Sequence, residues 1–277
     1  MCLARNGSAY TIHTHLMRPF RRVISDFDNN GRCRTSTTAF CYDENRMLKA
    51  DTTDFGGKRR FITTWLRPQQ FTSISNENVY SLMKKANRLS PVIETKKEVE
   101  VSGSRILISA ERQEYADTNI VYPQMLKKAS ENGDYRLEVA YDYDDAGHLL
   151  YEYHEDGLTK SYFWARPSAS TNHLRLVGVA EAGGSPISPG WLSSVSANAP
   201  VISESMYARI IDLYRNNDMP TAIKLVLFRY DDSGNISSIE DSRGVRKYYK
   251  YDIMGRVITV GDNQNRISEV FNYNYPE

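Results

Sequence analysis

The chain has 277 residues, and its 35 Lys and Arg nearly balance its 34 Asp and Glu, giving a formal net charge of +1. This balance lacks the one-signed field that nucleic acids and anionic membrane surfaces require, so we expect neither as the main partner. At 40% hydrophobic the chain can bury a core, and its 19 tyrosines against 9 phenylalanines favour half-buried faces of a β-sheet.

The N-terminal segment has no apolar core of signal-peptide type, and no apolar run approaches the ~18 residues that a membrane span needs. We therefore expect neither a signal peptide nor a membrane span in the chain. Its three cysteines, Cys2, Cys33 and Cys41, show no CxxC spacing, so the sequence indicates neither a disulfide framework nor a zinc site. A bridge between Cys33 and Cys41 remains open.

The segment SDFDNNGR raises the question of a calcium loop. Its first, third, fifth and sixth loop positions would be Asp26, Asp28, Asn30 and Gly31. The twelfth position falls on Thr37 instead of the bidentate Glu that such a site requires. We therefore interpret FDNNGR at 27–32 as the turn of a β-hairpin.

Histidines give two weaker hints of metal binding. His13 and His15 would share one face of a strand, but no third ligand lies near them in the sequence. A second set of potential ligands is His148, Glu152, His154, Glu155 and Asp156. A turn at Gly157 would end their strand, so we expect no metal site in either place.

Two segments carry the periodicity of amphipathic helices. In 75–89, Val79, Leu82, Met83 and Ala86 recur at helical spacing. In 203–216 the apolar face comprises Met206, Ile210, Leu213 and Tyr214, and a Gly/Ser/Pro-rich connection at 183–200 precedes it. We predict two short helices that interrupt a β structure.

Repeats dominate the C-terminal third. Tyr230 and Tyr251, Gly234 and Gly255, and Asp241 and Asp262 are each 21 residues apart, so 228–251 and 251–275 form two units. Gly244 and Asn265 supply a second turn position in each unit. A third copy holds Tyr143, Gly147 and Gly157 at the same offsets, with His154 in place of the second Asp, and a weaker fourth begins at Tyr42-Asp43, with Arg46 replacing the first glycine.

A turn about every ten residues, with aromatic and β-branched residues between, predicts consecutive antiparallel strands joined by tight turns. The fold class is therefore mainly β: a strip or partial spiral of antiparallel hairpin repeats with two helical insertions. The residues expected at the repeat turns, with their tyrosines, are Tyr143, Asp144, Gly147, Gly157, Tyr230, Asp231, Gly234, Asp241, Gly244, Tyr251, Asp252, Gly255, Asp262 and Asn265.

The chain divides in sequence into five segments, expected to form one continuous domain. They are degenerate hairpins at 1–66, a helical insertion at 67–98, a β region with one repeat at 99–170, a Gly/Ser/Pro-rich and helical insertion at 171–224, and two repeats at 225–277.

The repeat units resemble those of YD-repeat proteins, also called RHS (rearrangement hotspot) proteins, whose unit reads approximately YDxxGRLxxVxDxxGxxxxYxY. YDIMGRVITVGDNQNRISEVFNYNY at 251–275 is a close match, and 228–251 is nearly as close. PVIETKKEVE at 91–100, the segment 135–150 and SYFWARP at 161–167 look like the region near the end of Bacteroidetes-type RHS surface proteins. The resemblance implies a strip of hairpins, envelope-associated or secreted.

The sequence contains no GxSxG, HExxH, GxxxxGK[ST] or GxGxxG, so we predict no catalytic residue, no cofactor and no enzymatic activity. The resemblance implies a scaffold that binds a glycan or a protein through its sheet surface or through its C-terminal edge strand, where self-association is also expected. The alternative is a remnant of the shell of an RHS polymorphic-toxin carrier that lacks the family's DPxG self-cleavage motif and toxin region.

Overall fold

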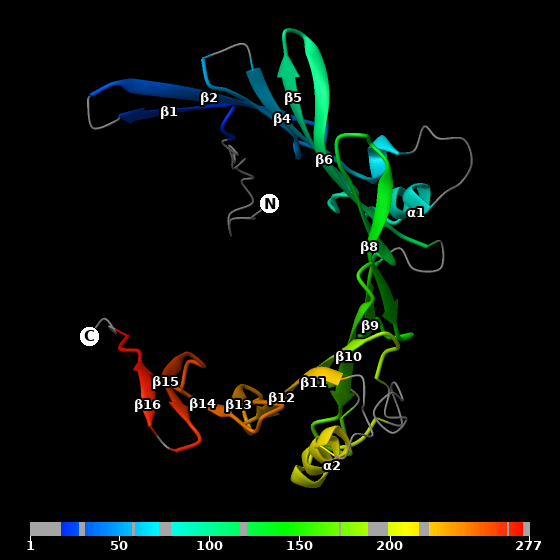
Figure 1. Ribbon diagram of the computed structural model, residues 1–277, viewed down its shortest axis with the longest axis vertical. Coiled ribbons are helices and arrows are strands. Elements are labelled where there is room, and N and C mark those ends of the chain that lie inside the picture. The colour runs from blue at the N-terminus through cyan, green and yellow to red at the C-terminus, as the bar shows by residue number, and fades with distance from the viewer. Residues whose placement is uncertain are drawn as a thin grey trace, which may run out of the picture. The chain divides into compact units, whose positions relative to one another are not determined.

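The computed structural model describes residues 18–27, 31–56, 59–71, 79–116, 121–171, 173–187, 199–215, 222–264 and 266–273. Within them, sixteen antiparallel strands are hydrogen-bonded in chain order, β1 to β16, without a crossover (Figure 1). The described helices are η1 (Pro68–Gln70), α1 (Val79–Lys85) and α2 (Glu204–Arg215). This confirms the predicted fold class, mainly β with hairpin connections and two helical insertions.

The strands are short and follow one another closely along the chain. The first eight are β1 (Arg21–Phe27), β2 (Cys33–Tyr42), β3 (Leu48–Asp54), β4 (Arg59–Leu66), β5 (Glu94–Val101), β6 (Ser104–Glu114), β7 (Met125–Ala129) and β8 (Tyr135–Tyr143). The next eight are β9 (Leu149–His154), β10 (Leu158–Ala165), β11 (Arg175–Gly183), β12 (Ala222–Tyr230), β13 (Ile236–Asp241), β14 (Arg246–Tyr251), β15 (Val257–Asp262) and β16 (Ile267–Val270).

The chain divides into two compact units, Met1–Gln113 with Lys128–Tyr135 and Glu114–Lys127 with Arg136–Glu277. In the first unit, Met83 of α1 and Ile93 are fully buried, and Ile62 of β4 is 6% exposed. The carboxylate of Glu94 is 1% exposed and accepts hydrogen bonds from the Arg112 guanidinium, at 3.3 Å, and from the Tyr135 hydroxyl. These two donors take the place of water at the buried carboxylate.

The segment that resembled a calcium loop lies between paired strands. β1 and β2 form an antiparallel hairpin whose innermost pair is Phe27 with Cys33, and Gly31 between them has a φ of +72°. This is the hairpin that FDNNGR predicts. Asp28 and Asn30 lie outside the described residues, as do His13 and His15.

The two described cysteines do not form the bridge that the sequence left open. Cys33 and Cys41 are both free and exposed, and both lie on β2. Eight residues of extended strand separate them by about 26 Å, far beyond disulfide reach. Cys2 lies outside the described residues.

α1 is shorter than the predicted helix at 75–89, of which residues 75–78 lie outside the described residues. Its C-terminal end has a clear cause: Asn87 adopts the left-handed region with a φ of +55°. The Asn87 amide then donates to the Lys84 carbonyl and the Arg88 amide to the Met83 carbonyl, which is a Schellman motif. The periodicity of 75–89 did not reveal this stop, because an Asn near a helix end carries no periodic signal.

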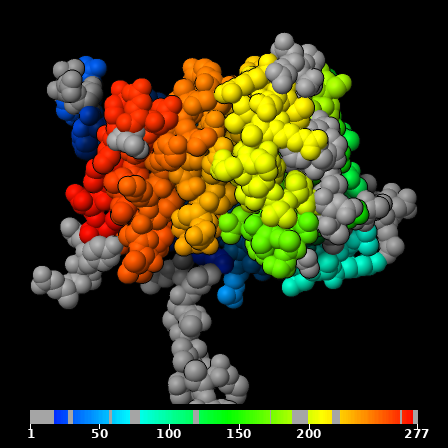
Figure 2. All heavy atoms as spheres, turned by 90° about the horizontal axis from the view of Figure 1, so that it is seen from below, coloured from blue at the N-terminus to red at the C-terminus, as the bar shows by residue number. Residues whose placement is uncertain are grey.

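α2 covers one face of the second unit. The Ser203 hydroxyl accepts a hydrogen bond from the Met206 amide at 3.2 Å, so it is the N-cap of the predicted helix. Met206, Tyr207 and Ile210 of α2 pack with alternate strand residues in a core of Phe163, Ala165, Val177, Ala180, Ala182, Ile187, Leu225 and Leu227. Figure 2 shows α2, in yellow, at the surface beside the orange strands.

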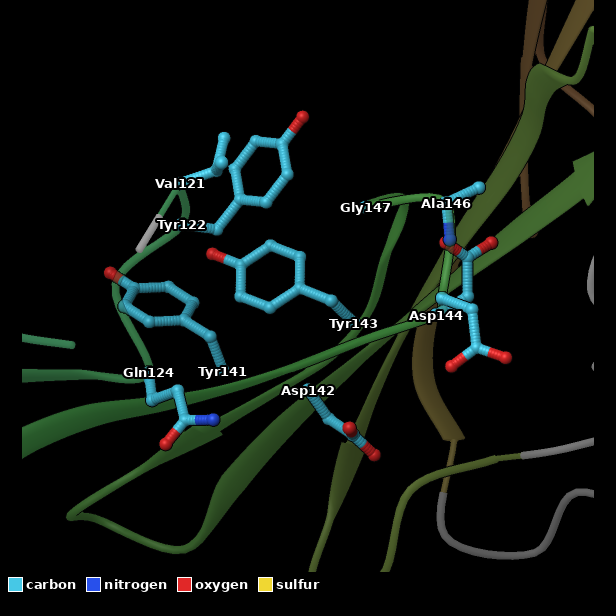
Figure 3. A pocket seen from close by; sticks show the side chains of 10 residues that line it. Val121, Tyr122, Gln124, Tyr141, Asp142, Tyr143, Asp144, Ala146 and Gly147 are labelled. Carbon is cyan, nitrogen blue, oxygen red and sulfur yellow. The ribbon is translucent and has the colours of Figure 1, made fainter. Parts of the chain in front are cut away.

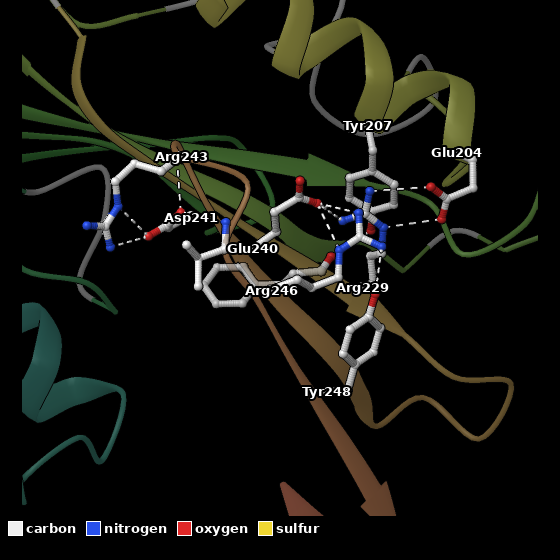
Figure 4. A network of polar contacts seen from close by, with 10 residues as sticks. Glu204, Tyr207, Arg229, Glu240, Asp241, Arg243, Arg246 and Tyr248 are labelled. Atoms are coloured by element: carbon white, nitrogen blue, oxygen red, sulfur yellow. Dashed lines mark hydrogen bonds and ion pairs between the residues drawn. The ribbon is translucent and has the colours of Figure 1, made fainter. Parts of the chain in front are cut away.

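An ion-pair network lies where α2 meets β12. Arg229, 8% exposed, donates to Glu240 at 2.6 Å, and its guanidinium lies 4.4 Å from the centre of the Tyr207 ring (Figure 4). Arg246 also donates to Glu240 at 2.6 Å, and Glu204 of α2 accepts from Arg229 at 3.2 and 3.3 Å. Two arginines thus share one buried carboxylate, and the network links α2 to β12, β13 and β14.

No helix in the described part of the chain combines the length and the hydropathy that a bilayer crossing requires.

Candidate functional site

One turn geometry recurs along the sheet, anchored by an aspartate. The Asp amide donates to the carbonyl of the residue four positions later, and the Asp Oδ1 accepts from the amide of that same residue. The turn occurs at Asp43, Asp144, Asp231, Asp241, Asp252 and Asp262. The side chain therefore satisfies an amide that a tight turn would otherwise leave unpaired.

The third residue after the aspartate has a positive φ. Gly147, Gly234, Gly244 and Gly255 have φ between +75° and +92°, and Arg46 has +61° at the matching position of the weak copy. The amide of each of these residues donates to the carbonyl of its aspartate. In the repeat at 228–251 the first and second turns, at Asp231 and Asp241, are thus the same Asp-x-x-Gly turn, which the 21-residue period alone does not reveal.

One described position of the predicted set departs from this pattern. At Gly157 the amide donates to the His154 carbonyl, and the Asp156 carboxylate, in place of the missing first-position aspartate, accepts from the Leu158 amide at 3.0 Å. The turn survives because Gly157 keeps a φ of +83°. Asn265 lies outside the described residues.

Hydrogen bonds at these turns lower the pKa of two of the carboxylates. A side-chain hydrogen bond from Arg243 is the largest cause that lowers the pKa of Asp241, and one from Arg266 does the same for Asp262. A carboxylate with a lowered folded pKa stabilises the fold above its unfolded pKa of about 3.9 and loses that contribution as pH falls through the folded value.

We therefore expect the melting temperature to be flat above about pH 5 and to fall below about pH 4. Circular dichroism melts across this range measure it. The double substitution Asp241→Asn and Asp262→Asn should flatten the acid limb, because Asn keeps the acceptor and removes the titration. An acid limb identical to that of the wild type would contradict the role of these carboxylates.

The repeat tyrosines differ in what their hydroxyls do. Tyr230 donates to the Leu176 carbonyl at 2.5 Å, Tyr251 to the Ile236 carbonyl at 2.7 Å and Tyr273 to the Val257 carbonyl at 2.9 Å. These hydrogen bonds hold each hairpin against its neighbour. Tyr143 holds the same repeat position, but its hydroxyl takes part in none of the hydrogen bonds found among the described residues.

Instead, Tyr143 lines an open pocket of about 570 Å³ in the second unit (Figure 3). Its ring is stacked on that of Tyr122, with centroids 5.1 Å apart and an interplanar angle of 23°. The third ring is that of Tyr141, also on β8, whose centroid lies 6.3 Å from the centroid of the Tyr143 ring. The pocket is lined by Val121, Tyr122, Gln124, Tyr141, Asp142, Tyr143, Asp144, Asp145, Ala146 and Gly147.

The Asp144 turn forms one wall of this pocket, and Gly147 is required there. A Cβ on Gly147 would lie 2.3 Å from Cε2 of the Tyr122 ring, so only glycine allows the ring to close on the turn. The Asp144 carboxylate also contacts His148, with Oδ2 of Asp144 2.7 Å from Nδ1 of His148. The His148 ring packs on the Trp164 ring, with centroids 4.9 Å apart. These contacts fix the turn next to the tyrosine rings.

Burial raises the pKa of one phenol in the pocket. Burial, followed by the neighbouring Tyr141 and the Glu152 carboxylate, raises the pKa of Tyr143 to about 12. The Tyr143 hydroxyl therefore stays protonated at neutral pH and can donate a hydrogen bond. A ring that is protonated, half-buried and not bonded to the chain's own carbonyls is suited to contact a ligand.

The two histidines considered as metal ligands contact different carboxylates. His148 contacts Asp144, whereas His154 Nε2 lies 3.1 Å from Glu152, which also accepts from the Tyr162 hydroxyl at 2.7 Å. Over the described ranges, no three His, Cys, Asp or Glu side chains are grouped as a metal ion would need.

The pocket itself was not predicted. Tyr143, Asp144 and Gly147 were recognised as repeat residues, but Tyr122, Tyr141 and Gln124 were not singled out. The only sequence signal for them is the local density of tyrosine, with Tyr141 two positions before Tyr143 and therefore on the same face of β8. Tyr122 precedes β7 and belongs to no repeat, so nothing in the periodicity points to it.

The fold is similar to parts of solved toxin structures. A crystal structure of TcdB2–TccC3 matches with a TM-score of 0.35 and 12% identity, over 86% of this chain and 13% of that one. A Photorhabdus luminescens Tc holotoxin pore matches with a TM-score of 0.32 and 10% identity, over 88% of this chain and 15% of that one. The chain thus spans a small part of these proteins. No protein-family model and no curated protein matches it.

Proposed function

We propose that the chain is a non-enzymatic β-hairpin scaffold that binds a glycan at the pocket of Tyr122, Tyr141 and Tyr143. The observation that carries the proposal is the Tyr143 hydroxyl: its repeat counterparts Tyr230 and Tyr251 bond to neighbouring carbonyls, whereas Tyr143 faces the pocket. A sugar presents an apolar ring face and many hydroxyls. Aromatic rings that offer both packing and a hydroxyl complement it.

The size and the lining of the pocket fit this class of ligand. Ligand pockets typically enclose about 300–1,000 Å³ and combine apolar walls with a few fixed polar groups. Here the walls are tyrosine rings and Val121, and the polar groups are the Gln124 amide and the acidic turn after β8. Tyr122 is 38% exposed, so its ring is accessible from outside.

The test is a glycan array followed by titration calorimetry on the glycan that binds. Tyr143→Ala and Tyr122→Ala should each weaken binding about 10-fold, which corresponds to about 1.4 kcal/mol. Tyr248→Ala is the matched control, because Tyr248 on β14 is also 38% exposed but lies outside the pocket. Unchanged affinity in both pocket variants, or hydrolysis of the bound glycan, would contradict the proposal.

The resemblance to RHS proteins gives this function a setting in the cell envelope or outside the cell. It also supports a second candidate, a wall segment of an RHS-type carrier. On β12, Leu225 and Leu227 are buried under α2, whereas Val226 and Phe228 on the opposite face are only half-buried. A reading frame that continues downstream into DPxG and a new domain would favour this candidate over the glycan scaffold.

A further inference from the structure

The lining of the tyrosine pocket is charged with one sign only. It contains Asp142, Asp144 and Asp145, and no Lys, Arg or His. This contrasts with the whole chain, whose charges nearly cancel. A ligand that enters the pocket therefore meets a local negative field.

The three carboxylates are not equivalent. The Asp144 side chain is 1% exposed, and its oxygens accept from the amides of Ala146 and His148 and contact the His148 ring, so the turn uses it fully. Asp142 and Asp145 are exposed, and neither takes part in any ion pair or hydrogen bond found in the described ranges. Figure 3 shows the Asp142 side chain pointing away from the three rings. Asp145, in the turn itself, is the carboxylate best placed to meet a ligand.

Aromatic ring faces and carboxylates both attract positively charged groups. The negative face of a tyrosine ring attracts an ammonium group within about 6 Å, and a nearby carboxylate adds a direct Coulomb attraction. A uronate or sulfate would be repelled by the same carboxylates, and the lining offers no cation to offset that repulsion. An uncharged sugar gains only the packing and the hydrogen bonds.

We infer that the pocket prefers glycans with free amino groups over neutral ones and rejects anionic ones, with Asp145 as the residue that sets this preference. The inference rests on the proposed glycan binding. The competing explanation is that Asp145 is an ordinary solvated turn residue, as Asp232 is at the same position of a later repeat, one residue after its anchoring aspartate.

The experiment compares three oligosaccharides of equal length by titration calorimetry: oligomers of glucosamine, of N-acetylglucosamine and of glucuronate. At about pH 6, where a sugar amine is protonated, the glucosamine oligomer should bind about 10-fold tighter than the N-acetylated one, and the glucuronate oligomer should not bind. Added salt should reduce the preference, because it screens exposed charges.

Variants then assign the preference. Asp145→Asn should reduce the ratio between the two glucosamine-based affinities about 5-fold, because Asn keeps a polar side chain in the turn but removes its charge. Asp232→Asn is the matched control and should behave as the wild type. Equal affinities for the two oligomers, binding of the glucuronate oligomer, or a preference that persists in Asp145→Asn would overturn the inference and leave glycan binding intact. Absence of binding by every glycan would overturn the proposed function as well.

Discussion

Glu240→Gln should lower the free energy of unfolding by about 3 kcal/mol, because it removes a buried carboxylate that two arginines share. Glu240 is 6% exposed and accepts from Arg229 and Arg246 at 2.6 Å each. Gln has nearly the same shape, so packing is preserved and the lost charge is what changes. The remaining partner of Arg229 is Glu204, whose side chain is 78% exposed and screened by solvent.

Urea unfolding followed by circular dichroism measures this loss. Arg243→Gln is the matched control: Arg243 pairs with Asp241 at 2.7 Å, close to the Arg229–Glu240 distance, but its side chain is 79% exposed (Figure 4). Its free energy of unfolding should stay within about 1 kcal/mol of that of the wild type, because exposed pairs contribute little. Equal curves for Glu240→Gln and Arg243→Gln would show that burial does not matter at this network.

A second variant separates the loss of charge from the loss of the pair. Replacing Arg229 and Glu240 together by Met should recover much of the stability, because the buried Arg229 charge is then removed, and Arg246, whose side chain is 27% exposed, can be solvated when it loses Glu240. If the double variant is as unstable as Glu240→Gln, the network itself, and not the unpaired arginine, determines the docking of α2.

The turns of the sheet were predictable because they are encoded locally. Each Asp-x-x-Gly turn depends on a carboxylate, a glycine and the two residues between them, so a spacing in the sequence is enough to place it. Asp231 with Gly234 and Asp252 with Gly255 show this directly. Even Arg46 adopts a φ of +61° in the weak copy, which shows that the aspartate and the paired strands together impose the turn.

The ion-pair network of Arg229 and the tyrosine pocket were not predictable, because both depend on contacts between segments distant in sequence. Arg229 alternates with Leu225 and Leu227, so the period of two places it on their face, but only the position of α2 shows that this face is buried. Similarly, Tyr122 reaches Tyr143 from a segment outside the repeats. Contacts between elements distant in sequence depend on the whole fold and leave no periodic signal.

Gly147→Ala should open the tyrosine pocket. At a φ of +87° any side chain is strained by about 1–2 kcal/mol, and here the new Cβ would also lie 2.3 Å from the Tyr122 ring. The flexible ring will move before the turn does, since the turn is fixed by Asp144. The stack on Tyr143 is then lost, which costs about 0.5–1.5 kcal/mol more, and glycan affinity should fall with it.

Gly157→Ala isolates the backbone part of this effect. Gly157 has a φ of +83°, close to that of Gly147, but nothing lies within 4 Å of its added Cβ. Urea unfolding should therefore show a smaller loss for Gly157→Ala, with unchanged glycan binding and an unchanged near-ultraviolet dichroism signal of the tyrosines. In Gly147→Ala combined with Tyr122→Ala, the clash is absent, so the second substitution should cost less stability than Tyr122→Ala alone. If Gly147→Ala and Gly157→Ala destabilise equally and both retain the dichroism signal, the Tyr122 ring does not close on this turn in solution.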